Sequence, residues 1–413
     1  MLKRSTHNSG GGRYGTVVTL SWPHLTYETV RWTRDADDGQ VSRTARRRHA
    51  GPYQAAVVPP IAEATPDLPA EVLAAADDAS QEMARFDAEV GGEVAPFESV
   101  LLRSEAAASS QIENLTASAR AIAEAELGLS GRRNADQIVA NVRAMAAAAR
   151  LADAIEPESI LVMHRALMAD TEPRIAGVWR TQQVWIGGSA LGPHQAEFVP
   201  PQHQRVVPAI DDLVRFIARD DLPVLIHAAL AHAQFETIHP FPDGNGRTGR
   251  ALLHAVIRNK GLTRAVTVPV SAGLLVDTAG YFAALRAYQQ GDPRPIVERL
   301  ADACLAAVAG GRRLVSQLRE VRQGWEERVT VRRGALARSL LDVLVRRPVV
   351  DAALAAAELG VSRSNVYGPI QHLVDEGILV EFTDRRRSRA WRAPEVLELL
   401  DEFAASTGRR SLP

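Results

Sequence analysis

The sequence predicts a mainly α-helical protein that ends in a small winged helix-turn-helix domain. Helical periodicity runs with few breaks over residues 69–169 and resumes from residue 206. A hairpin pattern between residues 177 and 201 separates the two helical parts. From residue 336, three short helical patterns precede two strand patterns, which is the element order of a winged helix.

The composition is that of a globular chain long enough for two or three domains. Of 413 residues, 46% are hydrophobic and 23% are charged. Cys304 is the only cysteine, so an intrachain disulfide is excluded, and no apolar run approaches the roughly eighteen residues that span a bilayer. Residues 1–15 lack the apolar segment of a secretory signal. We therefore expect a cytoplasmic protein without membrane contact.

The elements follow in a definite order. Residues 1–50 are rich in Gly, Ser, Thr and Arg and are expected to be a poorly ordered leader, with structure beginning near Gly51. An N-terminal helical region is expected over 51–175 and a catalytic core over 176–330, in which two or three helices fill 279–328. A winged-helix domain is expected over 331–395 and a C-terminal tail over 396–413.

The pattern of the hairpin is short. The apolar residues 184–186 are followed by a Gly187-Gly188 turn and then by Phe198-Val199. In the expected winged helix, helices are predicted over 336–346, 351–359 and 362–376, and strands over 378–383 and 388–392. We expect this domain to fold separately from the core.

The most informative segment is the loop His-Pro-Phe-Pro-Asp-Gly-Asn-Gly-Arg-Thr-Gly-Arg at residues 239–250, between helices predicted over 222–237 and 246–259. Two glycines around Asn245 let backbone N–H groups converge at a helix start, where they favour an anion such as a diphosphate. Guanidinium groups three residues apart, at Arg247 and Arg250, suit phosphate oxygens. Asp243 offers a carboxylate to Mg²⁺, and His239 is a candidate general base.

This loop fits the pattern H-x-F-x-[DE]-G-N-G-R-x-x-R, and the chain resembles the Fic family over roughly residues 51–300. The resemblance implies a Fic-type helical bundle with a β-hairpin flap that docks the target by strand addition. Val184, Ile186, Gly187 and Gly188 match the flap. Ser109, Glu113 and Asn114 match the inhibitory motif [ST]-x-x-x-E-[GN], on a helix expected over about 97–114.

The resemblance further implies transfer of AMP from ATP to a hydroxyl of a protein, with Glu113 as the inhibitor. His239 would deprotonate the hydroxyl and Asp243 would hold Mg²⁺, while Arg247 and Arg250 would bind the β- and γ-phosphates. The expected catalytic residues are His239, Asp243, Asn245, Arg247 and Arg250. The expected ATP-binding residues are Phe241, Gly244, Asn245, Gly246, Arg247, Arg250 and Tyr281.

Two aromatic assignments have alternatives. Phe241 suits a buried anchor of the loop better than a catalytic role. Tyr281 and Tyr288 lie seven residues apart on a predicted helix, where closing an adenine pocket and packing in the core are equally compatible with the spacing.

Other functions stay open. The same site could remove AMP from a modified protein, with Glu113 positioning a water, whereas transfer of other groups usually accompanies departures from the motif, and none is seen here. A different hypothesis makes residues 335–392 a DNA-binding module and the Fic core its sensor. Residues 311–413 hold 18 Lys and Arg against 14 Asp and Glu, which is a net charge of +4, whereas the net charge of the whole chain is −1. DNA-contacting candidates are Ser362, Arg363, Ser364, Asn365, Tyr367, Arg385, Arg386, Arg387 and Arg389.

The expected partners are ATP and an unidentified protein target, with the chain itself as a further candidate target. A homodimer and DNA binding through 335–392 are compatible with the sequence. It leaves open the target and its hydroxyl type, the oligomeric state, the dominant direction of AMP transfer, and whether the winged helix binds DNA or protein.

Overall fold

The structure is a computed structural model that describes residues 22–32, 48–92, 97–129, 131–189, 191–330, 335–383 and 389–408. The α-helices are α2 (Ala70–Gly91), α3 (Phe97–Ile112), α4 (Ala119–Glu126), α5 (Arg133–Leu151), α6 (Pro157–Met168), α7 (Val206–Ile217), α8 (Val224–Ile238), α9 (Asn245–Asn259), α10 (Val270–Leu274), α11 (Thr278–Gln289), α12 (Arg294–Arg328), α13 (Leu336–Arg346), α14 (Ala352–Leu359), α15 (Arg363–Asp375) and α16 (Pro394–Gly408). The strands are β1 (Thr26–Arg31), β2 (Pro52–Val57), β3 (Val349–Asp351), β4 (Val380–Glu381) and β5 (Ala390–Arg392), so the expectation of a mainly α protein is confirmed.

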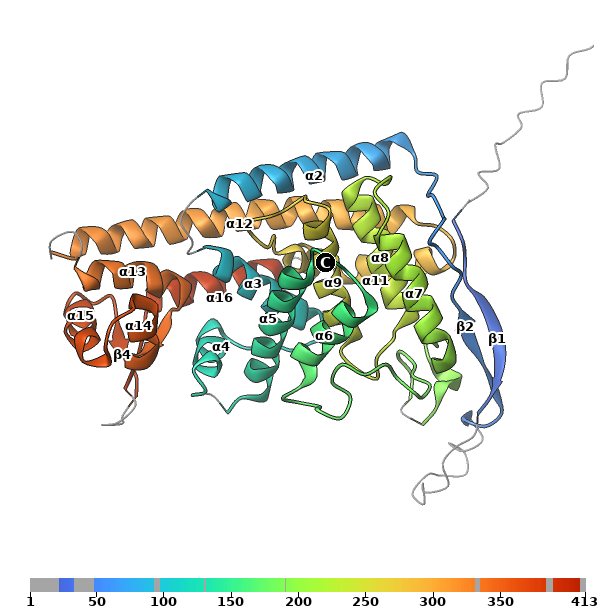
Figure 1. Ribbon diagram of the computed structural model, residues 1–413, viewed down its shortest axis with the longest axis horizontal. Coiled ribbons are helices and arrows are strands. Elements are labelled where there is room, and N and C mark those ends of the chain that lie inside the picture. Colours follow the sequence, from blue (N-terminus) through green and yellow to red (C-terminus); the bar gives the residue numbers. More distant parts are fainter. Residues whose placement is uncertain are drawn as a thin grey trace, which may run out of the picture.

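Helices α2 and α12 lie side by side along one edge of the molecule (Figure 1). On α2 the buried side chains, among them Ala76, Met83 and Phe86, recur at helical spacing and form an apolar stripe. The helices approach closely where Phe86 faces Gly311, since a Cβ at Gly311 would lie 2.9 Å from the Phe86 ring. This long pair forms one wall of the core. Of the two or three helices expected over 279–328, the chain forms two, α11 and the 35-residue α12.

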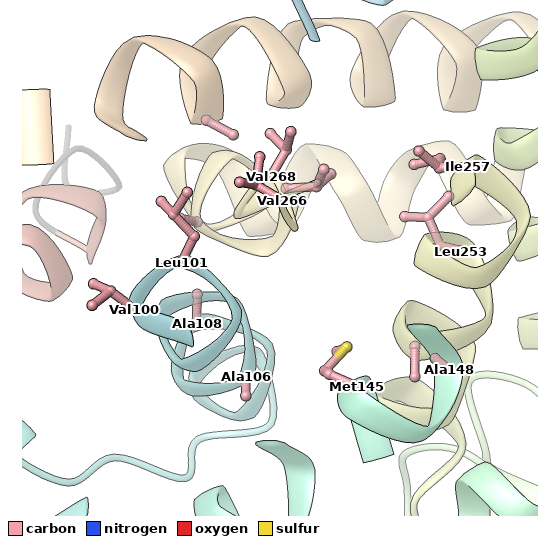
Figure 2. Close-up of a cluster of buried hydrophobic side chains, with 14 of the residues drawn as sticks. Val100, Leu101, Ala106, Ala108, Met145, Ala148, Leu253, Ile257, Val266 and Val268 are labelled. Carbon is pink, nitrogen blue, oxygen red and sulfur yellow. The ribbon is translucent and has the colours of Figure 1, made fainter. Parts of the chain in front are cut away.

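Three helices that position the functional site pack together in the middle of the core. Side chains of α3, α5 and α9 converge there with the segment that follows α9, as Figure 2 shows for Leu101, Met145, Leu253 and Val266. All four are buried in one hydrophobic cluster. Burial of such side chains contributes about 1.5–3 kcal/mol each, so α3 belongs to the packed core along most of its length.

The expectation of a poorly ordered leader over 1–50 is wrong for residues 22–32. These residues include β1, which pairs antiparallel with β2 in the register Thr26 to Val57. Trp22 anchors the segment because it is 2% exposed and contacts Phe216 and Tyr288. The sequence pattern does not predict this strand, because the strand that pairs with it lies more than twenty residues further along the chain. The rest of the expected leader, residues 1–21 and 33–47, lies outside the described residues.

The C-terminal elements follow the expected order with differences in detail. The described part comprises α13, β3, α14, α15, β4 and β5, and its antiparallel sheet has the order β3-β5-β4. Strand β3 was not expected, and β4 and β5 are shorter than the predicted 378–383 and 388–392. Arg385, Arg386 and Arg387, the candidate wing arginines, lie outside the described residues. Whether this part acts as a winged helix stays a prediction.

The expectation of a C-terminal tail over 396–413 is wrong for the described part, which forms α16. Val396, Leu397 and Leu400 are buried along one side of this helix. Helix α16 runs from the C-terminal elements back toward the middle of the molecule (Figure 1), where it contacts α3, α4 and α12. Its apolar stripe therefore joins the C-terminal elements to the core, and the boundary expected at 395 divides a single helix.

None of the described helices has an apolar stretch long enough to cross a lipid bilayer.

Candidate active site

A cavity of about 720 Å³ opens between the loop after α8, the start of α9, the end of α3, residues 185–198 and α11. The predicted residues that line it are Glu113, Ile186, Gly187, His239, Asp243, Gly244, Asn245, Gly246, Arg247, Arg250 and Tyr281. Lining residues that were not among the predicted site residues are Leu115, Gln137, Trp185, Glu197, Phe198, Glu236, Pro242, Phe282, Leu285, Arg286 and Gln289.

The loop between α8 and α9 is shaped by its own backbone and by one amide. Helix α8 ends at His239, which has a left-handed backbone with φ of 50°, and Gly244 has φ of 75° before α9 begins. The Asn245 side chain accepts from the Phe241 N–H at 2.8 Å and donates to the Phe241 carbonyl at 2.9 Å. Both polar ends of the Asn245 amide therefore bond to the backbone of Phe241, and these two bonds hold the shape of the loop.

Phe241 is the anchor of this loop and does not line the cavity, so its assignment as an ATP-binding residue is wrong. It is fully buried and stacks on His164, with ring centroids 3.7 Å apart, and on Trp179, at 4.9 Å. His164 also donates from Nε2 to the Asp243 carbonyl at 3.0 Å, because its Nδ1 accepts from the Gly177 N–H at 2.9 Å. The Phe241 ring is therefore covered by other side chains and is not exposed to a ligand in the cavity.

His239 is held as a neutral imidazole. Its Nδ1 lies 3.4 Å from the Glu236 carbonyl, which can only accept, so Nδ1 carries the hydrogen and Nε2 keeps its lone pair. Burial lowers the pKa of His239 to about 4. The buried Arg180 donates from Nε to the His239 carbonyl at 2.8 Å and so secures the strained backbone. An uncharged base with a free lone pair is what deprotonation of a hydroxyl requires.

The first turn of α9 presents the guanidinium of Arg247 to the cavity. Arg247 is 5% exposed, and its Nε has no hydrogen-bond partner among the described residues. Burial lowers the pKa of Arg247, but a guanidinium stays charged at neutral pH. A buried cation that has no ion pair with a carboxylate in the described part of the chain, beside the N-terminus of a helix, is a site for an anionic ligand.

Asp243 is exposed, and its Oδ1 accepts from the Gly244 N–H at 2.6 Å. Among the described residues, no group of three or more His, Cys, Asp or Glu side chains converges as a metal site. A lone carboxylate at a phosphate site fits Mg²⁺, which is usually bound by one or two carboxylates together with substrate phosphates. The donor set is therefore compatible with Mg²⁺ shared with a nucleotide.

Arg250 is occupied by the end of α3. Its Nε donates to Ser109 Oγ, and its Nη2 donates to both the Ser109 carbonyl and Glu113 Oε1, each at 2.8 Å. The Arg250 side chain is only 2% exposed, whereas that of Glu113 is 39% exposed because it faces the cavity. Burial opposes ionisation of Glu113, but the charge of Arg250 outweighs this and lowers the pKa of the carboxyl.

The Glu113 carboxylate also covers the anion cradle. A Cβ built on Gly246 would lie 2.1 Å from Glu113 Oε1, so the carboxylate rests directly on the first turn of α9. This is where the helix N-terminus favours a negative group. Glu113 therefore places a negative group both at Arg250 and at the backbone of the first turn of α9.

The backbone conformation of Asn114 ends helix α3 just before the cavity. It has φ of 61°, and the Leu115 N–H donates back to the Ser110 carbonyl at 3.0 Å, as in a Schellman helix end. Left-handed backbone at this position favours Gly or Asn. Helix α3 therefore stops at Ile112, two residues before the expected end, and leaves Glu113 at the mouth of the cavity.

Helix α3 is fixed along its length by buried polar contacts. Arg103 donates to Glu126 on α4 and to the Arg346 carbonyl at the end of α13, both at 3.0 Å. Glu105, which is fully buried, accepts from the Ser271 N–H at 2.8 Å and lies 2.9 Å from His254 on α9. Such contacts define position because each buried polar group must keep its partner. The register of Glu113 is therefore set by the core and by the C-terminal elements together.

Tyr281 is buried between the cavity and α8. Its hydroxyl lies 2.7 Å from His232 Nε2, and His232 Nδ1 lies 3.1 Å from the Gly249 carbonyl. The carbonyl requires a hydrogen on Nδ1, so the tyrosine donates to Nε2. Through His232, which also bonds to the Gly249 carbonyl just before Arg250, Tyr281 supports the turn of α9 that carries this arginine. Tyr288 bonds to Gln234 at 2.9 Å and does not line the cavity, so it packs in the core.

The expected flap hairpin is reduced to a single antiparallel bridge between Ile186 and Phe198. The turn depends on glycine, because Gly187 and Gly188 have φ of 73° and 74° and a Cβ at Gly188 would lie 2.3 Å from the Gln195 carbonyl. Ile186 and Gly187 line the cavity, while Val184 and Gly188 do not. Ile186, Gly187, Glu197 and Phe198 thus form one rim of the site.

Comparisons with known proteins agree on the nature of this part of the chain. Residues 154–257 match the family model described as Fic/DOC family. A protein adenylyltransferase fic-1 of Caenorhabditis elegans is 34% identical over 153 residues, covering 36% of this chain and 27% of the relative. A protein adenylyltransferase Fic of Nematostella vectensis is 28% identical over 166 residues, covering 38% and 35%. The alignments thus span only about a quarter to a third of these relatives.

A solved structure extends the likeness of the fold. A Fic family protein from Desulfovibrio desulfuricans G20 matches with a TM-score of 0.52 at 21% identity, over 79% of this chain and 97% of that chain. At this identity the match concerns the fold alone. Residues 154–257, which contain α8, the loop with His239 and most of α9, are a Fic domain of the Fic/DOC family.

Proposed function

We propose that this chain transfers AMP from ATP to a hydroxyl of a protein, and that Glu113 restrains the reaction. The observation that carries the proposal is the juxtaposition of a neutral His239 with an anion site at the start of α9 whose second arginine is bound by Glu113. The names of the relatives, protein adenylyltransferases, support the same chemistry.

The proposed reaction is an in-line displacement at the α-phosphorus. His239 Nε2 takes the proton of the target hydroxyl, the hydroxyl oxygen bonds to the α-phosphorus, and the bond to the β-phosphate oxygen breaks, which releases pyrophosphate. The backbone of Gly244 and Gly246, together with Arg247, holds the phosphates in place. Asp243 would hold Mg²⁺, which when bound neutralises phosphate charge.

Two features around the site support these roles. The rim at Ile186 and Gly187 places backbone beside the cavity, where a target segment could add by main-chain hydrogen bonds. Phe282 on α11 is 41% exposed and lines the cavity, so it offers an aromatic face for the adenine, while Tyr281 stays behind it as a support.

The proposal predicts which label stays on the protein. Purified Glu113→Gly protein is incubated with Mg²⁺ and ATP labelled on either the α- or the γ-phosphate, and the label on the protein itself is measured. We expect covalent α-label and no γ-label, because AMP carries only the α-phosphate. Asp243→Asn should label less and recover in part at raised Mg²⁺. Retention of the γ-label would instead establish phosphoryl transfer, and the proposed reaction would be wrong.

A second function, DNA binding by the C-terminal elements, is favoured by one observation. At the start of α15, Arg363, Asn365 and Tyr367 are exposed, as are the neighbouring serines. We propose that this end of the helix contacts duplex DNA. The affinity should fall with salt, with a logarithmic slope of about 0.9 for each phosphate contacted, and Arg363→Ala should reduce that slope by about one. A gel shift over a salt series measures it, and binding that salt does not weaken would exclude this role.

A further inference from the structure

Glu236 is a carboxyl group in the nucleotide cavity to which the proposed reaction assigns no role. It lies on α8, one turn before His239, and lines the cavity beside Arg250. Its Oε1 is buried and has no hydrogen-bond partner among the described residues. A buried carboxylate oxygen without a donor is costly, so this group invites either a proton or a ligand that supplies a partner.

Its position is imposed by the close packing of α8 on α9. A Cβ built on Gly249 would lie 2.4 Å from Glu236 Oε1 and 2.9 Å from the ring of Phe235. Only a glycine leaves room for the carboxyl at this point. Because Gly249 is followed directly by Arg250, the Glu236 carboxyl is held against the turn of α9 that carries the arginine.

The groups that face Glu236 come from three other helices. Arg250 on α9 favours its ionised form, while Glu113 on α3 disfavours it. Tyr281 on α11 offers no hydrogen to it, since the tyrosine donates to His232 on α8. Burial is the largest influence and raises the pKa of Glu236 to about 7. The carboxyl is therefore poised between its two protonation states near neutral pH.

Nucleotide binding changes this balance. When a polyphosphate displaces Glu113 from Arg250, one carboxylate leaves and a more highly charged group arrives beside Glu236. An ionised Glu236 would repel that group, whereas a protonated one can donate an O–H hydrogen bond to it. We propose that Glu236 takes up a proton from solvent when the nucleotide binds. The protonated carboxyl then donates an O–H hydrogen bond to the terminal phosphate that Arg250 holds. This deepens the proposed function and rests on it.

The proposal is tested by calorimetry of proton uptake. Full-length Glu113→Gly protein is titrated with ATP and Mg²⁺ in two buffers of different ionisation enthalpy between about pH 7 and about pH 9. We expect each molecule of ATP that binds to bring uptake of up to one proton. As the pH rises, the affinity for ATP should weaken, with a limit of about tenfold per pH unit, because binding requires that an ionised Glu236 be protonated again. Adding Glu236→Gln should abolish the uptake attributable to the protein and leave the affinity nearly independent of pH, because the amide keeps a donor without titrating.

Two controls isolate the effect of this carboxyl. Glu197→Gln removes the same charge from another residue that lines the cavity and should keep the proton uptake. AMP, which lacks the phosphates that reach Arg250, should bind to the Glu113→Gly protein without the uptake, and this arm needs no variant of Glu236. Equal uptake with and without Glu236→Gln, or equal uptake with AMP and ATP, would overturn the inference while leaving the proposed function intact. Failure of ATP to bind the Glu113→Gly protein at all would remove the proposed function and this inference with it.

Discussion

His239→Ala is expected to lower the rate of AMP transfer by about two to four orders of magnitude while ATP still binds. The imidazole is neutral, and its Nε2 has a free lone pair, so its removal takes away the group that accepts the proton of the hydroxyl. The phosphate contacts at the start of α9 do not depend on it. Initial rates of α-label incorporation, measured alongside equilibrium binding of ATP in the Glu113→Gly background, separate the chemical step from binding.

A variant at another histidine serves as the control for this prediction. His203→Ala removes a partly exposed histidine that does not line the cavity and should leave the rate within about twofold of its parent. If His239→Ala labels the target as fast as its parent, His239 is not the base. If it also abolishes ATP binding, the residue supports the site and its catalytic role is not isolated.

The same residue sets the expected pH dependence. Its pKa is lowered to about 4, so the reactive neutral form is retained as the pH falls and is lost only near that value. The transfer rate at limiting ATP should therefore show no loss attributable to His239 between about pH 6 and about pH 8 and should fall in proportion to the neutral fraction below about pH 5. A rate that already halves near the ordinary histidine pKa would show that His239 is more hydrated in solution.

Glu113→Gly is expected to raise auto-labelling with ATP by about tenfold to a hundredfold, the factor that corresponds to a charge-assisted hydrogen bond of about 1.5–3 kcal/mol. The carboxylate occupies Arg250 and lies on Gly246, so its removal frees both the guanidinium and the first turn of α9. We expect little gain in ATP affinity, since the restraint acts on the pose of the bound nucleotide. Label incorporation and the dissociation constant for ATP are the two measurements.

The end of α3 offers its own controls. Asn114→Gly keeps the left-handed backbone and the glutamate, and it should therefore leave inhibition in place. Glu113→Gln keeps the shape without the charge and should activate less than glycine does. Unchanged labelling in Glu113→Gly would refute self-inhibition, whereas loss of AMP removal from a premodified target would favour the reverse reaction, in which Glu113 positions a water.

The loop was predictable because its chemistry is local. Gly244 must adopt a positive φ, and the guanidinium groups of Arg247 and Arg250 follow at helical spacing. Contacts within one turn are set by residue types that lie next to each other in the chain. The same locality explains Asn114, whose left-handed backbone ends α3 and places Glu113.

The supports of the loop were not predictable. His164, Arg180 and His232 hold it from α6, from the segment before the flap and from the middle of α8. Single histidines and arginines in helical or loop sequence carry no spacing signal, and arginine is frequent in this chain. Phe241 lies within the motif, where an aromatic residue was expected to be a buried anchor of the loop, and the structure confirms this.

The sequence by itself determined the helical character of the chain, the identity of the loop and the residues that end α3, because periodicity and backbone conformation depend on near neighbours. The tertiary structure decided which distant segments meet. It paired β1 with β2, placed α16 against α3, and brought Glu236 against Gly249 next to Arg250. These contacts arise because buried surfaces must be filled and buried charges must find partners, and that requirement is met in three dimensions by residues that the linear order leaves far apart.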